Sequence, residues 1–158
     1  MPHPYSIRPY RDEDRETVTA WLAASEPWGR LGYRADDWAR LLSGPVTGRE
    51  AYLFEEEGTA AGFAVLRPRV LLGEYLELLV VDPLRRRRGI GARLLAAMES
   101  IAFDRVKNLY VCVSDFNVPA RRFYAAQGYR EIGPIPDLLV IGSAELLLRK
   151  TIGPARTS

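Results

Sequence analysis

The chain is poor in cysteine, histidine and lysine, and the first two shortages each exclude a class of function. The single Cys112 excludes an intramolecular disulfide, and nothing in the composition indicates an oxidising compartment. The only histidine, His3, lies near the N-terminus, which argues against a Ser-His-Asp triad, a Cys-His pair and most zinc sites. We therefore expect no metal centre.

Long apolar runs are also missing. No stretch approaches the roughly 18 apolar residues of a membrane span, and the opening "MPHPYSIRPYRDED" lacks the apolar region of a signal peptide. We expect a soluble, cytoplasmic protein with no membrane partner. The net charge of +2 is too small to indicate nucleic acid by itself. Only Lys107 and Lys150 are lysines, so arginine supplies the rest of the 22 basic residues.

The length and the hydrophobic content of 47% predict one domain over residues 1–158. Its ordered core is expected at roughly 5–150, followed by a flexible tail at 151–158. Apolar periodicity and Gly/Pro punctuation predict the element order β-α-α-β-β-β-α-β-α-β-β. The segments are "YSIRPY", a helix capped by Asp12, "ADDWARLL", a hairpin over 50–69, "GEYLELLVVDP" ended by Pro83, a helix through Leu94 and Met98, "NLYVCV", "NVPARRFYAAQ" closed by Gly128, "YREIG" and "AELLLRK".

The strand–helix–strand segment from 74 to 114 implies a parallel pair of strands joined by a right-handed crossover. The remaining strands can pair as an antiparallel meander. The sequence therefore predicts an α/β fold with a mixed sheet.

Between the two strands of that parallel pair lies "RRRRGIGARLL" (85–95), a glycine-containing loop that opens a helix. Such a loop suits a phosphate, because the first N–H groups of a helix lack partners and its dipole favours an anion. It is not a Walker loop, since no G-K-[ST] follows, and Leu94 stands where a dinucleotide fingerprint has its third glycine. A solvated basic turn and a polyanion patch stay open as alternatives.

A second constellation favours the phosphate interpretation. In "NVPARRFYAAQGY", Asn117 and Tyr124 are seven residues apart and share a helix face with Ala120 and Arg121. This helix follows the second parallel strand, and ligands of open α/β sheets bind outside the carboxyl ends of the strands. Two polar segments directed at one crevice indicate a single ligand there.

These two segments resemble those of the GNAT superfamily of acetyl-CoA-dependent N-acetyltransferases. Arg86, Gly89 and Gly91 occupy the positions of its motif R/Q-x-x-G-x-G/A, and "N-x-x-A-x-x-F-Y-x-x-x-G-Y" from Asn117 to Tyr129 matches its second cofactor segment. The resemblance spans roughly residues 5–150. It implies a single-domain GNAT fold, in which a mixed central sheet has a parallel pair splayed at the acetyl-CoA crevice and helices cover both faces.

The resemblance also implies how acetyl-CoA would be held. Backbone N–H groups of the loop would bind the pyrophosphate with added charge from the arginines, two residues of the preceding strand would line the pantetheine arm, and Asn117 would hydrogen-bond that arm. Asn117 has a second interpretation, as a helix N-cap. The implied cofactor-binding residues are Leu79, Val81, Arg86, Arg87, Arg88, Gly89, Ile90, Gly91, Ala92 and Asn117.

Tyr124 falls at the position of the family's usual general acid. A free thiol has a pKa of about 8.5 and tyrosine of about 10, so proton transfer to a leaving thiolate is near-balanced. The alternative is an aromatic packed beside Phe123. The expected base is Glu77, a carboxylate inside an apolar run, whose alternative is an ion pair with an arginine. Glu74 and Asp115 are further candidates.

Cys112 stands where some relatives that act on protein N-termini carry a glutamate, which sets this chain apart from them. We interpret Cys112 as a small hydrophobe rather than an acyl carrier. Trp28 and Tyr33 are expected at the edge of the acceptor pocket, with core packing as the alternative. Glu26 could attract a cationic amine.

The predicted function is acetyl transfer from acetyl-CoA to a primary amine by direct attack in a ternary complex. The alternative is a non-catalytic module that binds acetyl-CoA as a sensor. The expected partner is a small-molecule or peptide amine, with no nucleic acid and no membrane, and a homodimer is left open.

Overall fold

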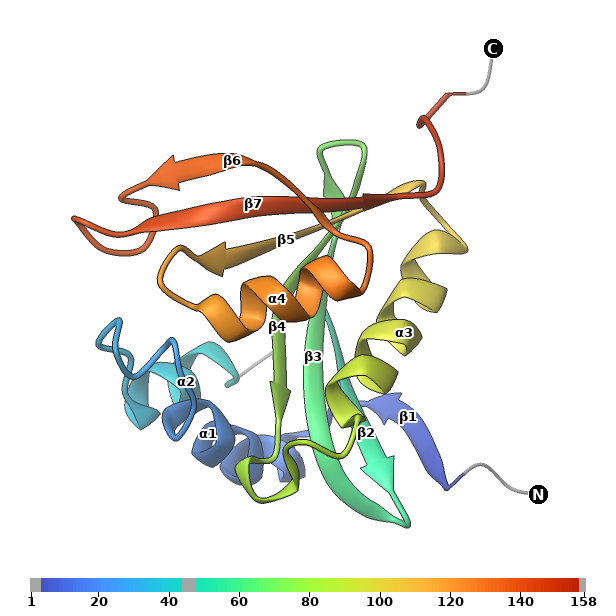
Figure 1. Ribbon diagram of the computed structural model, residues 1–158. Helices are drawn as coiled ribbons and strands as arrows, with labels where there is room; N and C mark the ends of the chain where they lie inside the picture. The colour runs from blue at the N-terminus through green and yellow to red at the C-terminus, as the bar shows by residue number, and fades with distance from the viewer. Residues whose placement is uncertain (1–3, 44–47, 157–158) are drawn as a thin grey trace. The chain divides into compact units, whose positions relative to one another are not determined.

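The computed structural model describes residues 4–43 and 48–156, and its elements follow the predicted order (Figure 1). Two short 3-10 helices, η1 and η2, are added to that order. The bounds are β1 (Tyr5–Pro9), η1 (Asp12–Asp14), α1 (Arg15–Ala23), α2 (Ala35–Leu41), β2 (Glu50–Glu56), β3 (Thr59–Val70), β4 (Gly73–Val81), η2 (Pro83–Arg85), α3 (Ile90–Phe103), β5 (Asn108–Ser114), α4 (Val118–Ala126), β6 (Arg130–Pro136) and β7 (Ala144–Thr151).

The strands are hydrogen-bonded in the order β1-β2-β3-β4-β5-β7-β6. β4 and β5 form the predicted parallel pair, whereas the pairs β1–β2, β2–β3, β5–β7 and β6–β7 are antiparallel. The parallel register runs from Glu74↔Leu109 to Leu76↔Val111, and the next residues, Glu77 and Cys112, lie beyond it. The predicted α/β fold with a mixed sheet is confirmed.

The chain forms two compact units. The first holds residues 1–66 and 78–98, and the second holds residues 67–77 and 99–158. β3, β4 and α3 have residues in both units, so the division falls inside continuous elements. One domain over residues 1–158 stays a prediction.

In the first unit, helices cover both faces of the strands. α1 and α2 pack through Trp21 and Trp38 on Leu53 and Phe63, which point to one face of β2 and β3. The neighbouring Phe54 points to the opposite face, because side chains alternate along a strand. On that face α3 approaches so closely that a Cβ on Gly62 would lie 3.0 Å from Cδ2 of Leu94 and 3.5 Å from Cβ of Phe54.

In the second unit, β5, β7 and β6 run side by side with α4 next to them (Figure 1). Glu99 of α3 accepts hydrogen bonds from Tyr129 Oη at 3.2 Å and from Lys150 Nζ at 2.8 Å, and so joins this helix to the ends of β6 and β7. At the start of β4, Glu74 is only 2% exposed and pairs with Arg105 Nε at 2.8 Å. This ion pair gives Glu74, a weaker candidate base, a structural partner.

Two element boundaries differ from the predicted ones. Asp12 was expected to cap the first helix, which is wrong: it lies in η1, and α1 begins at Arg15. Asp14 instead accepts the N–H of Arg11 at 2.8 Å and pairs with Arg8 at 2.7 Å, because two arginines surround it. At the other end, β7 extends one residue into the predicted tail. His3 and residues 157–158 lie outside the described residues.

Candidate functional site

The loop between β4 and α3 is built by Asp82 and two left-handed residues. The Asp82 carboxylate accepts the N–H of Leu84 at 3.0 Å, and its own N–H donates to Ala61 O at 2.9 Å, which ties the loop to β3. Arg87 and Gly89 then adopt φ values of 66° and 75°. Positive φ values are energetically costly for residues other than glycine, so the backbone at Arg87 is strained.

α3 starts at Ile90, and its first hydrogen bond runs from Arg93 N to Gly89 O at 3.1 Å. The N–H groups of Ile90, Gly91 and Ala92 therefore belong to the first turn, where an α-helix offers no acceptors of its own. These groups, with the positive end of the helix dipole, fit an anionic phosphate. The chemistry expected of "RRRRGIG" is thus compatible with the observed backbone.

The motif arginine has an unexpected partner. Arg86 Nη2 donates to Ser25 Oγ at 2.8 Å, and that hydroxyl donates to Trp21 O at 2.6 Å. Ser25 is 3% exposed at the end of α1, so the side chain of Arg86 fastens the loop to this helix. Arg87 and Arg88 are exposed and remain available to an anion.

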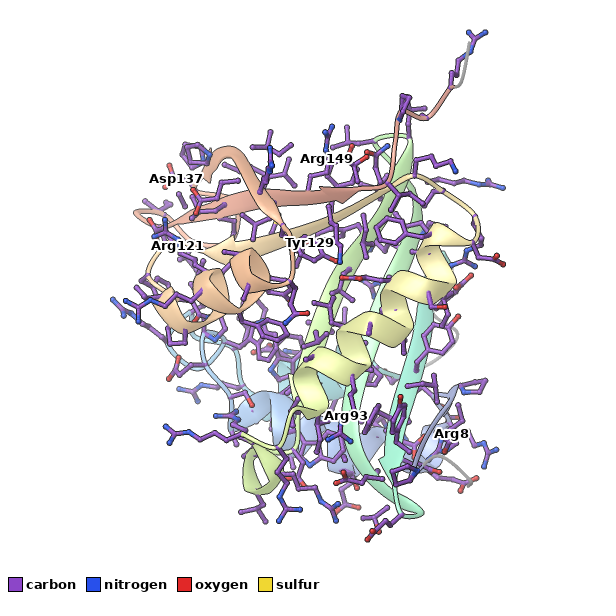
Figure 2. All side chains as sticks on the ribbon, turned by 45° about the vertical axis from the view of Figure 1, so that its right-hand side comes forward. Arg8, Arg93, Arg121, Tyr129, Asp137 and Arg149 are labelled. Atoms are coloured by element: carbon purple, nitrogen blue, oxygen red, sulfur yellow. The ribbon has the colours of Figure 1, made fainter. Side chains whose placement is uncertain are left out.

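Other arginines of the chain bind the protein itself. Arg93, labelled in Figure 2 on the first turns of α3, donates to Arg88 O at 2.8 Å and lies 3.5 Å from Glu56. Arg121 on α4 pairs with Glu131 at 3.0 Å. A polyanion surface would draw on these same arginines, and their ion pairs weigh against that alternative.

Leu79 and Val81 lie on β4 and alternate with Leu78 and Val80, which are buried in the core with α1 and α2. Leu79 and Val81 therefore point to the opposite face of the strand. Before them on β4, Leu76 is still paired with Val111 of β5, the last pair of the parallel register. Whether Leu79 and Val81 line a pantetheine arm stays a prediction.

Asn117 is the N-cap of α4, as its second interpretation required. Its Oδ1 accepts the N–H of Ala120 at 3.3 Å, and its own N–H donates to Ser114 O at 2.9 Å. The side-chain amide still has N–H donors to offer, so contact with the pantetheine arm remains a prediction.

Tyr124, on the last turns of α4, is 7% exposed. Its ring packs edge-on against Phe123 at 5.1 Å and against Tyr129 at 5.4 Å between centroids. Burial raises the pKa of the Tyr124 hydroxyl, so the group stays protonated and can act as a proton donor. The same rise makes transfer to a thiolate less favourable than the ordinary pKa values suggest.

Glu77 forms the ion pair that was its alternative interpretation. Arg67 Nε and Nη2 lie 2.9 and 3.3 Å from its two carboxylate oxygens. The carboxylate in turn raises the pKa of the Arg67 guanidinium. A role for Glu77 as base stays a prediction.

Trp28 and Tyr33 both pack on Trp38, at centroid distances of 5.4 and 5.1 Å. They sit at the border of the core of the first unit and are partly buried. Glu26 accepts the N–H of Arg30 at 3.0 Å. These contacts show that Trp28 and Tyr33 pack against the core. Their position at the edge of an acceptor pocket stays a prediction.

Sequence reasoning missed a polar cluster in the second unit, which we call the strand cluster: Tyr75, Cys112, Ser114 and Glu145. Tyr75 and Cys112 influence each other's pKa, and Glu145 acts electrostatically on both. Glu145, at the start of the apolar run "AELLLRK", is a carboxylate in an apolar strand like Glu77, so the sequence could have identified it as a candidate. The strand register that places it near Cys112 could not be predicted from the sequence.

The geometry offers no metal site: within residues 4–43 and 48–156, no group of three or more His, Cys, Asp or Glu side chains is placed to hold one. Over the same residues, no helix has the length and apolar character of a membrane span.

The acetyltransferase (GNAT) family model matches residues 10–129. Ard1 from Thermoplasma volcanium superimposes with a TM-score of 0.78 at 20% identity, covering 96% of this chain and 100% of that one. The ribosomal-protein-S18-alanine N-acetyltransferase from Escherichia coli gives 0.75 at 19%, covering 98% and 97%. An aminoglycoside 6'-N-acetyltransferase complexed with coenzyme A gives 0.68 at 19%, covering 97% and 99%. At these identities the likeness shows the fold. Sequence comparison with curated proteins gives no match.

Proposed function

The chain belongs to the acetyltransferase (GNAT) family, and from this membership we propose that it transfers an acetyl group from acetyl-CoA to a primary amine by direct attack in a ternary complex. The observation that carries the proposal is the loop from Asp82 to Ile90, which opens α3 with exposed arginines and first-turn N–H groups. The structural neighbours include N-acetyltransferases for an alanine of ribosomal protein S18 and for an aminoglycoside. Both accept an amine, which supports an amine acceptor here.

Acetyl-CoA supplies an acetyl group activated as a thioester. The residues of this chain that would hold it are those of the loop and α3, with N–H groups from Arg87 to Ala92 toward the pyrophosphate. Leu79 and Val81 would border the pantetheine arm and Asn117 would bind it. Arg86 contributes by holding the loop at Ser25, and Arg87 and Arg88 contribute charge.

Tyr124 is the proposed general acid, which protonates the departing sulfur. Its raised pKa keeps the proton on the hydroxyl until a thiolate is generated nearby. Burial also raises the pKa of Cys112, which opposes the thiolate form that a covalent acyl carrier would need. Direct transfer to the amine is therefore favoured over an acyl-cysteine.

The test is free-CoA release from acetyl-CoA against a panel of polyamines, aminoglycosides, amino acids and peptides. An enzyme should turn over at least one of these amines. Tyr124→Phe should then lose turnover while CoA affinity, measured by calorimetry, stays within about twofold. A protein that binds CoA but turns over no member of the panel would instead fit the sensor alternative.

A further inference from the structure

The strand cluster lies on one face of β4, β5 and β7. Ser114 stands opposite Glu145 in the β5–β7 register, and Cys112 stands two residues earlier on β5. Tyr75 pairs with Tyr110, the next residue of β5 in the same alternation. Because residues paired across strands share a face, Tyr75, Cys112, Ser114 and Glu145 all point to the same side.

The two carboxylates near this cluster differ in their partners. Glu77 is held by the guanidinium of Arg67. Glu145 is 6% exposed, and no arginine or lysine among the described residues lies within ion-pair distance of it. A buried carboxylate without a cation is costly unless a charged or hydrogen-bonding group approaches it.

Ser114 adds a second observation at the same place in the cluster. Its hydroxyl is buried and has no hydrogen-bond partner among the described residues. It lies near enough to lower the pKa of Glu145 somewhat, but the geometry falls short of a hydrogen bond. Buried hydroxyls in native proteins are normally paired, so an unpaired one beside an unpaired carboxylate needs an explanation.

We infer that Glu145 is the catalytic base of the acetyl transfer: it binds the ammonium group of the acceptor beside Ser114 and Cys112 and removes its proton. This inference rests on the proposed function. The buried position of Glu145 also raises the pKa of its carboxyl, mainly by desolvation and with a further contribution from Asp115. A base with a raised pKa lies closer to neutrality, where proton transfer from an ammonium ion costs less.

The step balances in atoms and protons. The Glu145 carboxylate takes one proton from R–NH₃⁺, which leaves a lone pair on nitrogen. A bond forms between that nitrogen and the acetyl carbonyl carbon, the bond from this carbon to sulfur breaks, and the sulfur takes the proton of Tyr124. The amide nitrogen loses its extra proton to water. Glu145 then releases a proton to water and Tyr124 regains one, so no oxidant, reductant or metal is required.

The charges around Glu145 also restrict the acceptor. Asp115 acts on Glu145 electrostatically, and Tyr75 and Cys112 stay neutral because their pKa values are raised. A cation is attracted to such a site, and a second carboxylate on the ligand is repelled. The acceptor class is therefore a cationic primary amine without a carboxylate next to the amine, such as a polyamine, an amino sugar or a peptide N-terminus, rather than a free α-amino acid.

The test compares Glu145→Gln with Glu77→Gln, using free-CoA release with the best amine of the panel from pH 6 to 10. Loss of a general base typically costs about 10²–10⁴-fold. We expect Glu145→Gln to lower kcat/KM at pH 7 at least a hundredfold, and the deficit should shrink toward pH 10, near the amine pKa of about 10.4. Glu77→Gln should show no deficit that shrinks toward pH 10. Glu131→Gln, which removes a carboxylate paired with Arg121, is the matched control and should stay within about fivefold of the wild type. All three variants should bind CoA normally by calorimetry.

Each other outcome decides against the inference or against its premise. A large, pH-dependent loss in Glu77→Gln with an active Glu145→Gln gives the base role to Glu77. Free α-amino acids as the best acceptors overturn the acceptor class. A wild-type protein that turns over no amine refutes the proposed function itself. If Glu145→Gln does not fold, Glu145→Asp keeps a carboxylate one methylene shorter, and we expect a lower rate whose deficit shrinks toward pH 10. A deficit of the same size at every pH overturns the inference.

Discussion

Replacing Ser25 with alanine tests whether the Arg86–Ser25 hydrogen bond prepares the loop for acetyl-CoA. The bond is 2.8 Å long and joins an exposed loop to the buried end of α1. Without it, Arg86 is free to turn into water and the strained turn at Arg87 loses its nearest anchor. CoA binding must then order the loop, and the affinity should fall.

The size of the effect follows from the environment of the two partners. A hydrogen bond with one charged partner contributes about 1.5–3 kcal/mol when both groups are desolvated. Arg86 is exposed and regains water in the variant, so we expect a smaller loss, about 1 kcal/mol. That corresponds to an approximately fivefold weaker Kd.

The assay is calorimetric titration of CoA into the wild type, Ser25→Ala, Arg86→Ala and the double variant. The two single effects should not add, because each breaks the same bond: Ser25→Ala should cost little more once Arg86 is gone, with a coupling of about 1 kcal/mol. Ser43→Ala is the matched control, since Ser43 Oγ donates to the carbonyl of Arg40 at 2.9 Å at the end of α2 and touches no loop arginine. If Ser25→Ala weakened CoA binding equally in the wild type and in Arg86→Ala, the hydrogen bond would not be what prepares the loop. Wild-type CoA affinity in Ser25→Ala would refute the idea as well.

Two further predictions concern the loop charge and the sheet. Replacing both Arg86 and Arg87 with glutamate should weaken CoA binding at least tenfold, about 1.4 kcal/mol. An unchanged Kd for CoA in calorimetry would show that this loop does not bind the phosphate. Gly73→Ala should lower the free energy of unfolding by about 1–3 kcal/mol or more, because a Cβ there would collide with the backbone carbonyl oxygen of Asn108. Gly133→Ala, which meets nothing within 4 Å, is its control in thermal unfolding, and equal melting temperatures of the two variants would contradict the packing argument.

Element order was predictable because it depends on local signals. Pro83 and Gly128 end a strand and a helix through their own backbone preferences, and both lie where the sequence placed them. The parallel pair followed from the length of the crossover. The start of α1 was misjudged because Asp12 and Asp14 are both suitable caps, and the ion pair of Asp14 with Arg8 of β1 could not be read from the local pattern.

The backbone part of the candidate site was accessible for the same reason. A glycine motif reports the conformation of its own segment, and α3 does begin within "RRRRGIG". Side-chain partnerships were not accessible in this way. Arg86 meets Ser25 across 61 residues of sequence, and Glu77 meets Arg67 across the β3–β4 turn. Twenty-two basic residues offered many partners to one carboxylate, and only the folded arrangement selects one.

Which carboxylate acts as the base, Glu77 or Glu145, depends on which of them pairs with an arginine in the folded protein. At the level of sequence, Glu77 and Glu145 are alike, since each interrupts an apolar strand. Once Arg67 neutralises Glu77, removing a proton from an ammonium ion there would give a protonated carboxyl and break a two-point ion pair, whereas Glu145 has no such pair to lose. The strand register adds to this argument, because Glu145 pairs with Ser114 across β5 and β7 and therefore lies on the same face as Cys112, two residues earlier on β5.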